Sequence, residues 1–384
     1  MWRLPSARRG RNRKRSSSLP EIDDRIWRPD LLAVLDYEVL WEASQKAYSE
    51  NPLATWWVSA TPGVNYYRAE LPARHVPGKT VFLEDRDIQP LEDGHWFPRQ
   101  EGSTAIWMFP GNVARWLLMA EMRLNHDLHV LVEVDDNYLT GPPIPSMSEW
   151  ASTRERANLS TGVSYECHRA IVSSEACQGI IVSTPRLGEA YERFGKPIHV
   201  CPNSIDPADW DMDPANQPDN VLRIGWAGSA SHAYDLADIR GALDWAARQR
   251  DVEVVVLGQL QPGVEHRQIP WTDDLAQYRR NVCELDVILC PIRPSPWADC
   301  KSDVKALEGA MAGAVPVVSR TEPFRPWFER TYVAETPKEY LKIVKHLVAN
   351  REETRQAAEK AREYVLRERT IQDSVHEWRR ALEP

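Results

Sequence analysis

The pattern of hydrophobic and polar positions changes along the chain near residue 53. Before this point, residues 31–43 place apolar side chains at the spacing of one helical face, after Pro29 and Asp30, a typical start signal. After it, short β-rich runs such as LATWWVSA, TAIWMF, HVLVEV and QGIIVST alternate with helical stretches such as PRLGEAYERFG. This alternation predicts an α/β domain with a parallel sheet.

A second series of the same kind begins at Val221. Its expected strands are VLRIGWAGS, VEVVVLG, DVILCPI and VPVVS, and helical stretches separate them. VEVVVLG is almost wholly apolar, which is typical of a strand covered on both faces of a parallel sheet. The two series predict two doubly wound, Rossmann-like domains joined near PNSIDPADWDMDPANQPD, a stretch rich in Pro, Asn and Asp.

This organisation divides the chain into four expected segments. Residues 1–28 are a disordered basic tail, residues 29–203 the N-terminal domain, residues 204–350 the C-terminal domain and residues 351–384 a C-terminal helix.

Composition narrows the class of protein. The 384 residues carry a net charge of −9, and no apolar run reaches the ~18 residues that span a bilayer. The first residues lack the apolar stretch of a secretory signal, so a cytoplasmic protein is expected. The six cysteines show no metal-type spacing, which favours reduced thiols and no metal site.

The negative net charge argues against a whole surface that binds nucleic acid. The basic cluster at residues 8–15 is the exception. It is either a solubilising tail or a docking arm for an anionic partner, such as DNA or a membrane surface.

Open α/β sheets bind ligands at the carboxyl ends of their strands. In the second series, the turn with Gly225 and Gly228 would let backbone approach a phosphate, although a plain tight turn explains the glycines equally well. His232 follows this turn and is either a ligand of a phosphate or sugar or an ordinary surface histidine.

The stretch CKSDVKALEGAMAGAVPVVSR predicts a helix from Ser302 to Gly313, with Lys301, Lys305 and Glu308 along one stripe. Lysines at a helix N-terminus oppose the helix dipole, and an anionic ligand would remove that penalty. A diphosphate would meet both ammonium groups there, and Glu308 could accept hydrogen bonds from sugar hydroxyls. A solvated charged stripe is the alternative.

Several stretches, in this order, resemble glycosyltransferases of GT-B fold, the retaining group-one type. KSDVKALEGAMAGAVPVVS is similar to the family's donor-site pattern E-x7-E-A-M-A-x-G-x-P-V-V, and RIGWAGS to its second glycine loop. PNSID resembles the interdomain P-N-G-[VI]-D. TPGVNYYRAELPA and VLVEVDDNY resemble first-domain segments of a subset.

The resemblance implies a metal-independent enzyme without a cofactor, which transfers a sugar from a nucleotide-diphosphate sugar to a hydroxyl acceptor. The acceptor could be a glycan, protein, lipid or modified DNA base, the last also because such enzymes occur in bacteriophages. Glu308 aligns with the glutamate that holds the ribose. The implied donor-binding residues are Gly228, Ser229, His232, Lys301, Ser302, Lys305 and Glu308.

For catalysis we expect Lys301 and Lys305 to stabilise charge on the leaving diphosphate and Asp136 to act on the acceptor side. The other expected acceptor-side residues are Gly63, Asn65, Arg68 and Asp135. A metal-binding role for Asp135 and Asp136, a capping role for the pair, and an ion pair of Arg68 with Glu70 or Glu84 are the alternatives.

The chain also departs from the family pattern. Cys300 stands where the first glutamate of E-x7-E is expected, and Ser229 and Tyr234 stand where many members carry a basic pair. Lys301 and Lys305 would then replace the missing basic pair. The same departures motivate the alternative of a degenerate, non-catalytic protein that binds nucleotide sugars or glycans or acts as a scaffold.

Overall fold

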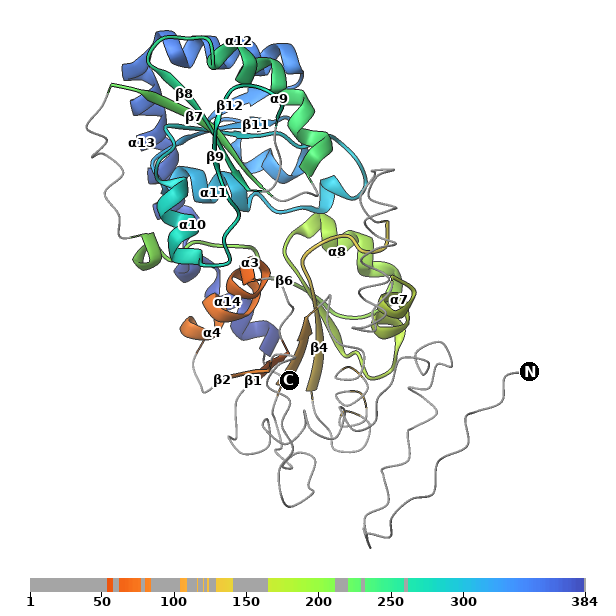
Figure 1. Ribbon diagram of the computed structural model, residues 1–384. Coiled ribbons are helices and arrows are strands. Elements are labelled where there is room, and N and C mark those ends of the chain that lie inside the picture. The colour runs from red at the N-terminus through yellow and green to blue at the C-terminus, as the bar shows by residue number, and fades with distance from the viewer. Residues whose placement is uncertain are drawn as a thin grey trace, which may run out of the picture.

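The computed structural model describes most of the second half of the chain and parts of the first. The described residues are 54–57, 62–76, 80–83, 104–108, 116, 120, 123, 129–140, 165–210, 220–228, 232–258 and 262–382. The expected basic tail, the expected helix near residues 31–43 and Ser229 lie outside these ranges. Two six-stranded sheets, parallel throughout, form two domains (Figure 1).

The first sheet has the strand order β2-β1-β3-β4-β5-β6. Its strands are β1 (Ala54–Trp57), β2 (Thr80–Leu83), β3 (Thr104–Met108), β4 (His129–Val134), β5 (Gly179–Val182) and β6 (Ile198–Val200). Its helical segments are α3 (Pro62–Asn65), η1 (Tyr66–Glu70), α4 (Leu71–His75), α7 (Tyr165–Ser173), α8 (Pro185–Tyr191) and η3 (Glu192–Phe194). Gly195 ends η3 with φ +65°, as its place after the helical stretch predicts.

The second sheet has the order β12-β11-β10-β7-β8-β9. Its strands are β7 (Leu222–Gly228), β8 (Val252–Gly258), β9 (Arg267–Ile269), β10 (Val287–Cys290), β11 (Val315–Ser319) and β12 (Tyr332–Ala334). Its helices are α9 (Ala233–Ala246), α10 (Leu275–Val282), α11 (Val304–Met311), α12 (Pro337–Ala349) and α13 (Arg351–Glu368), with short turns η4 (Pro207–Trp210), η6 (Ala298–Cys300) and η7 (Glu322–Trp327).

Both faces of the second sheet are covered, which explains why its strands are so apolar. Val255 and Leu257 of β8 pack in one cluster with α11 and α13, while Val254 and Val256 pack in another with α9 and α12. The predicted doubly wound α/β architecture is confirmed.

The C-terminal segment differs from the single helix that the sequence predicts. α13 ends at Glu368 and packs on the second domain, whereas α14 (Ile371–Leu382) packs beside α4 on the first domain (Figure 1). Thr370 forms a bridge with Ile205, and Ile205 exchanges backbone hydrogen bonds with Arg369 and Ile371 at 3.0 and 2.8 Å. The chain therefore crosses between the domains twice, side by side.

Within the part of the chain that the structure describes, none of the helices combines the length and apolar character that crossing a bilayer requires.

Candidate functional site

The segments that follow the carboxyl ends of strands in both sheets meet at the domain interface. Asp135 and Asp136 follow β4, Ser183 and Thr184 follow β5, and residues 291–303 follow β10. Thr184 donates its hydroxyl to the backbone oxygen of Cys300 at 2.9 Å. This is the edge at which open α/β sheets bind ligands.

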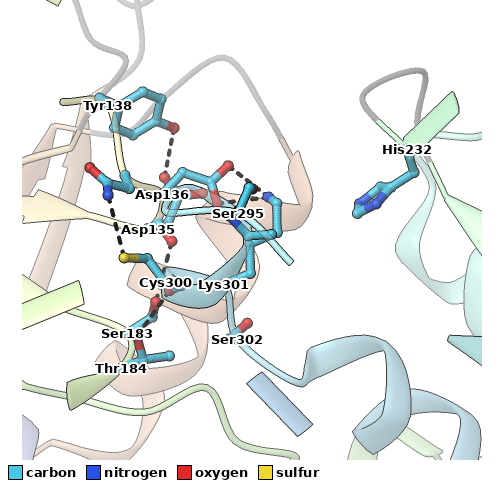
Figure 2. Close-up of polar contacts among 12 residues, drawn as sticks. Asp135, Asp136, Tyr138, Ser183, Thr184, His232, Ser295, Cys300, Lys301 and Ser302 are labelled. Carbon is cyan, nitrogen blue, oxygen red and sulfur yellow. Dashed lines mark hydrogen bonds and ion pairs between the residues drawn. The ribbon is translucent and has the colours of Figure 1, made fainter. Parts of the chain in front are cut away.

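Lys301 bridges the two domains. Its Nζ donates to both carboxylate oxygens of Asp136, at 2.7 and 3.0 Å (Figure 2). It also lies 3.8 Å from the ring centroid of Trp297. The expected helix start at Ser302 is wrong: α11 begins at Val304, and Lys301 lies before it in extended backbone. Lys301 is therefore on no stripe of α11.

Ser302 has a different role from the expected helix cap. Its hydroxyl oxygen accepts a hydrogen bond from Nδ2 of Asn203, at 2.8 Å, in the PNSID segment. This bond ties the approach to α11 to the first crossing between the domains.

Asp303 precedes α11 but turns its carboxylate away from the helix. The carboxylate accepts from Nε1 of Trp327 at 2.8 Å and from both terminal nitrogens of Arg369 at 2.6 and 2.9 Å. Because Asp303 makes no capping bond and no other described side chain caps the first turn, its outermost N–H groups can donate to another acceptor. Gly313, with φ +87°, ends the helix as predicted.

Lys305 lies in the first turn of α11, and its side chain reaches the ring of Trp226 in strand β7. Its Nζ is buried and has no hydrogen-bond partner among the described residues, and it lies 5.1 Å from the ring centroid of Trp226. Burial lowers the pKa of this ammonium group. A buried cation without a partner is costly, and an anionic ligand would remove that cost.

Glu308 lies one turn further along and is 8% exposed. One carboxylate oxygen accepts from the hydroxyl of Tyr67 at 2.7 Å and the other from that of Tyr278 at 2.8 Å. Burial raises the pKa of Glu308, while the two tyrosine hydrogen bonds act in the opposite direction.

The expected turn is wrong for Gly225, which lies inside strand β7 (Leu222–Gly228). The close approach is between the ends of β7 and β8, at Gly228 and Gly258. Gly258 has φ +127°, and a Cβ there would lie 2.0 Å from the backbone oxygen of Gly228. A Cβ on Gly228 would lie 2.5 Å from the ring of Trp226. Only glycine fits both positions, so backbone rather than side chains lines the ends of β7 and β8.

His232 is held by Asp235. Its Nδ1 lies 2.9 Å from the carboxylate, whose other oxygen accepts the backbone N–H of Arg293 at 2.8 Å. Burial, aided by the charge of Lys305, lowers the pKa of His232 to about 4. The ring points toward the side on which Lys301 lies (Figure 2).

On the first domain, Asp135 accepts the hydroxyl of Tyr138 at 2.8 Å. Burial and the neighbouring carboxylate of Asp136 raise the pKa of Asp135. Asp136 faces the second domain through Lys301, so the aspartate pair reaches the interface.

Arg68 lies in the first-domain core and is 1% exposed. Its Nε donates to Glu133 at 2.5 Å, its Nη1 to the backbone oxygen of Cys201 and to Asn203, and its guanidinium covers Trp378. Its carboxylate partner is Glu133 and not the expected Glu70, and the other expected partner, Glu84, lies outside the described residues. These contacts give Arg68 a structural role.

Gly63 and Asn65 lie in α3, directly before the turn η1 that contains Arg68. A Cβ on Gly63 would meet no atom of the described residues within 4 Å, so packing among them does not require glycine there.

Cys300 faces the first domain. It is 2% exposed, accepts from Nδ2 of Asn137 at 3.4 Å and donates its thiol to the backbone oxygen of Pro296 at 3.3 Å. Burial raises the pKa of this thiol to about 11. Cys300 is thus an inert part of the interface.

Sequence reasoning missed Tyr67 and Tyr278, which hold Glu308. Tyr67 lies in TPGVNYYRAELPA, a segment that carries the resemblance, but the residue predicted to act there was its neighbour Arg68. Tyr278 is one apolar position of α10, and nothing in its local pattern indicates a polar contact.

Residues 239–380 match the family model described as glycosyl transferase-like. No curated protein sequence matches the chain closely enough to count as a relative.

Among solved structures, the chain is similar to HepE from Anabaena in complex with UDP, with a TM-score of 0.58 and 12% identity over 86% of this chain and 98% of that one. A glycosyltransferase from Rickettsia africae gives 0.55 and 8% over 86% and 97%. TarM gives 0.55 and 11% over 75% of this chain and 56% of that one, so the chain spans little more than half the length of TarM. The expected GT-B fold is confirmed.

Proposed function

We propose that this chain, a GT-B-fold protein whose residues 239–380 match the glycosyl transferase-like family, transfers a sugar from a nucleotide-diphosphate sugar to a hydroxyl acceptor. The observation that carries the proposal is the buried ammonium of Lys305, which has no partner among the described residues and lies beside the uncapped N-terminus of α11. Both features suit the same anion.

The diphosphate would lie between α11 and the strand ends at Gly228 and Gly258. Lys305 would neutralise its charge, the first-turn N–H groups would donate to its oxygens, and His232 would supply a further hydrogen bond. Glu308 lies one turn after Val304, the first residue of α11, and would accept hydrogen bonds from the ribose hydroxyls. That the HepE structure was solved with UDP supports a diphosphate of this kind.

In the transfer, the bond between the sugar C1 and the leaving phosphate oxygen breaks, and a bond from C1 to the acceptor oxygen forms. Negative charge grows on the leaving diphosphate, where Lys305 and the dipole of α11 stabilise it. Asp136 would accept the proton of the acceptor hydroxyl after Lys301 turns from Asp136 toward the phosphate. Asp135 would help to hold the acceptor, with no metal ion required at the pair.

The acceptor remains a hydroxyl on a glycan, protein, lipid or modified DNA base, as the resemblance implies. Because residues 1–28 are basic, we propose that they guide the protein to an anionic partner, DNA or a membrane surface. A bacteriophage origin and a cytoplasmic location belong to the same proposal.

A second candidate, a non-catalytic binder of nucleotide sugars or glycans, is favoured by two observations. Lys301 is already paired with Asp136, and Cys300 turns toward the first domain instead of offering a carboxylate to a sugar.

Thermal unfolding with UDP, GDP, ADP and dTDP, and with the matching sugars, tests the proposal. A nucleotide at 100 times its Kd adds about 2.7 kcal/mol of stability, an easily measured shift. We expect one nucleotide class to stabilise the protein, and donor turnover or hydrolysis to separate the enzyme from the binder. If every nucleotide leaves the unfolding temperature unchanged, the donor site is refuted.

A further inference from the structure

The turn η1 directs consecutive side chains of the first domain to different partners. It is a single π-helical turn, Tyr66–Glu70, of the kind that often accompanies functional sites. Tyr66 donates to Asp209, Tyr67 donates to Glu308 and Arg68 donates to Glu133. Tyr67 therefore carries a first-domain hydroxyl onto the helix α11 of the second domain.

The carboxylate of Glu308 keeps acceptor positions beyond those that the tyrosines use. An ionised carboxylate has about four acceptor positions, two on each oxygen. In Glu308, Tyr67 uses one position on Oε1 and Tyr278 one on Oε2. Among the described residues no other donor uses Glu308, so one position on each oxygen remains, which suits the two neighbouring hydroxyls of a ribose.

The tyrosines also affect the charge of Glu308. The titratable groups that act on it or face it are Tyr67 from η1, Tyr278 and Arg279 from α10, Lys305 from α11 and Cys290 from β10. Burial raises the pKa of Glu308, and hydrogen bonds from Tyr67 and Tyr278 lower it ahead of the charges of Arg279 and Lys305. Without the hydroxyl of Tyr67, the carboxyl would keep its proton to higher pH, and a protonated carboxyl donates from an oxygen that the carboxylate uses to accept.

We propose that Tyr67 is a positioning residue of the donor site, whose hydroxyl reaches across the domain interface and holds the carboxylate of Glu308 ready for a ribose diol. This role rests on the proposed function. It means that the affinity of the second domain for its nucleotide depends on the first domain being docked. The donor site is thus completed by the domain that receives the acceptor.

Titration calorimetry of the full chain tests this role. The probe is whichever of UDP, GDP and ADP binds the wild-type protein, together with its 2′-deoxy counterpart. Tyr67→Phe removes only the hydroxyl. Tyr66→Phe is the matched control, because its hydroxyl bonds to Asp209 and not to Glu308. Glu308→Gln tests whether Tyr67 acts through the carboxylate.

We expect Tyr67→Phe to weaken nucleotide binding roughly tenfold, as the loss of a hydrogen bond to a charged group does. The preference for the ribonucleotide over its 2′-deoxy form should shrink in Tyr67→Phe and persist in Tyr66→Phe. The deficit should be larger at pH 6 than at pH 8.5, and Tyr67→Phe should add little to Glu308→Gln.

The failures are distinguishable. If no nucleotide binds the wild-type protein, the proposed function is overturned, and this role with it. If the wild-type protein binds a nucleotide and Tyr67→Phe binds it equally well, only the role of Tyr67 is overturned. An equal loss for ribose and deoxyribose, independent of pH and shared by Tyr66→Phe, identifies a general effect on domain packing and also overturns it.

Discussion

The two sides of the domain interface treat their charged groups differently. On the first domain, Arg68 is paired with Glu133 and Asp136 with Lys301. On the second, the Nζ of Lys305 has no partner within the described part of the chain, and the Asp303 carboxylate is turned away from the helix it precedes. Paired charges hold a structure together, whereas the unpartnered ammonium of Lys305 beside uncapped backbone is the arrangement that the proposed diphosphate would complete.

The largest effect is expected from Lys305→Met. Nucleotide affinity should fall roughly a hundredfold or more, because the variant removes one partner of a buried charge pair formed on binding. The free energy of unfolding without nucleotide should stay the same or rise, since a desolvated cation is lost. Calorimetry and urea unfolding measure the two, with the exposed Lys342→Met as control. A stability loss with unchanged affinity would contradict the comparison.

Arg68→Met should show the opposite profile. It leaves the carboxylate of Glu133 buried without its partner, which costs about 3–5 kcal/mol of unfolding free energy. Nucleotide affinity should change far less than in Lys305→Met. Urea unfolding followed by tryptophan fluorescence measures the loss, and a change below about 1 kcal/mol would show that Arg68 is not structural.

The pH dependence of stability tests the second-domain side of the interface, because burial and the charge of Lys305 keep His232 neutral there. The pKa of the imidazole is about 4 in the folded protein and about 6.5 in an unfolded chain, so the unfolded chain binds more protons between these values. The free energy of unfolding should therefore fall, by at most about 3 kcal/mol, as the pH decreases from about 6.5 to about 4. Urea unfolding over this range should show a smaller slope in His232→Gln, whereas the exposed His376→Gln serves as control.

The smallest effect is expected at Cys300. Cys300→Ser keeps a small polar group that can bond to Asn137 and Pro296, so stability should change by less than about 1.5 kcal/mol. Nucleotide affinity should be unaffected, because the thiol faces the first domain. A tenfold loss of affinity in a calorimetric titration would instead place this side chain in the donor site.

The sequence predicted the fold of the second domain better than it predicted the roles of individual site residues. The apolar strand VEVVVLG and the small residues of α11 have one plausible environment, a sheet covered on both faces, so local pattern determined the fold. β9 and β12 were missed because three-residue edge strands carry too little pattern.

The roles of individual side chains depended on distant partners, which local pattern does not reveal. Arg68 was expected at the acceptor because it follows a turn, but its partners Glu133 and Asn203 are 65 and 135 residues away. Lys301 was expected on the stripe of a helix that starts at Ser302. The residue that precedes α11 is instead Asp303, one position later, so Lys301 lies outside the helix. The bond from Tyr67 to Glu308 spans 241 residues.

The return of α14 to the first domain has a consequence for synthesis of the chain on the ribosome. The first-domain core contains Ile371, Trp378, Ala381 and Leu382, so it cannot close until these residues have emerged. α13, which contributes to the second-domain core, ends at Glu368, directly before α14 begins at Ile371. The apolar surface of the first domain that α14 covers therefore stays open until the whole second domain has been synthesised, an interval in which a chaperone could bind it.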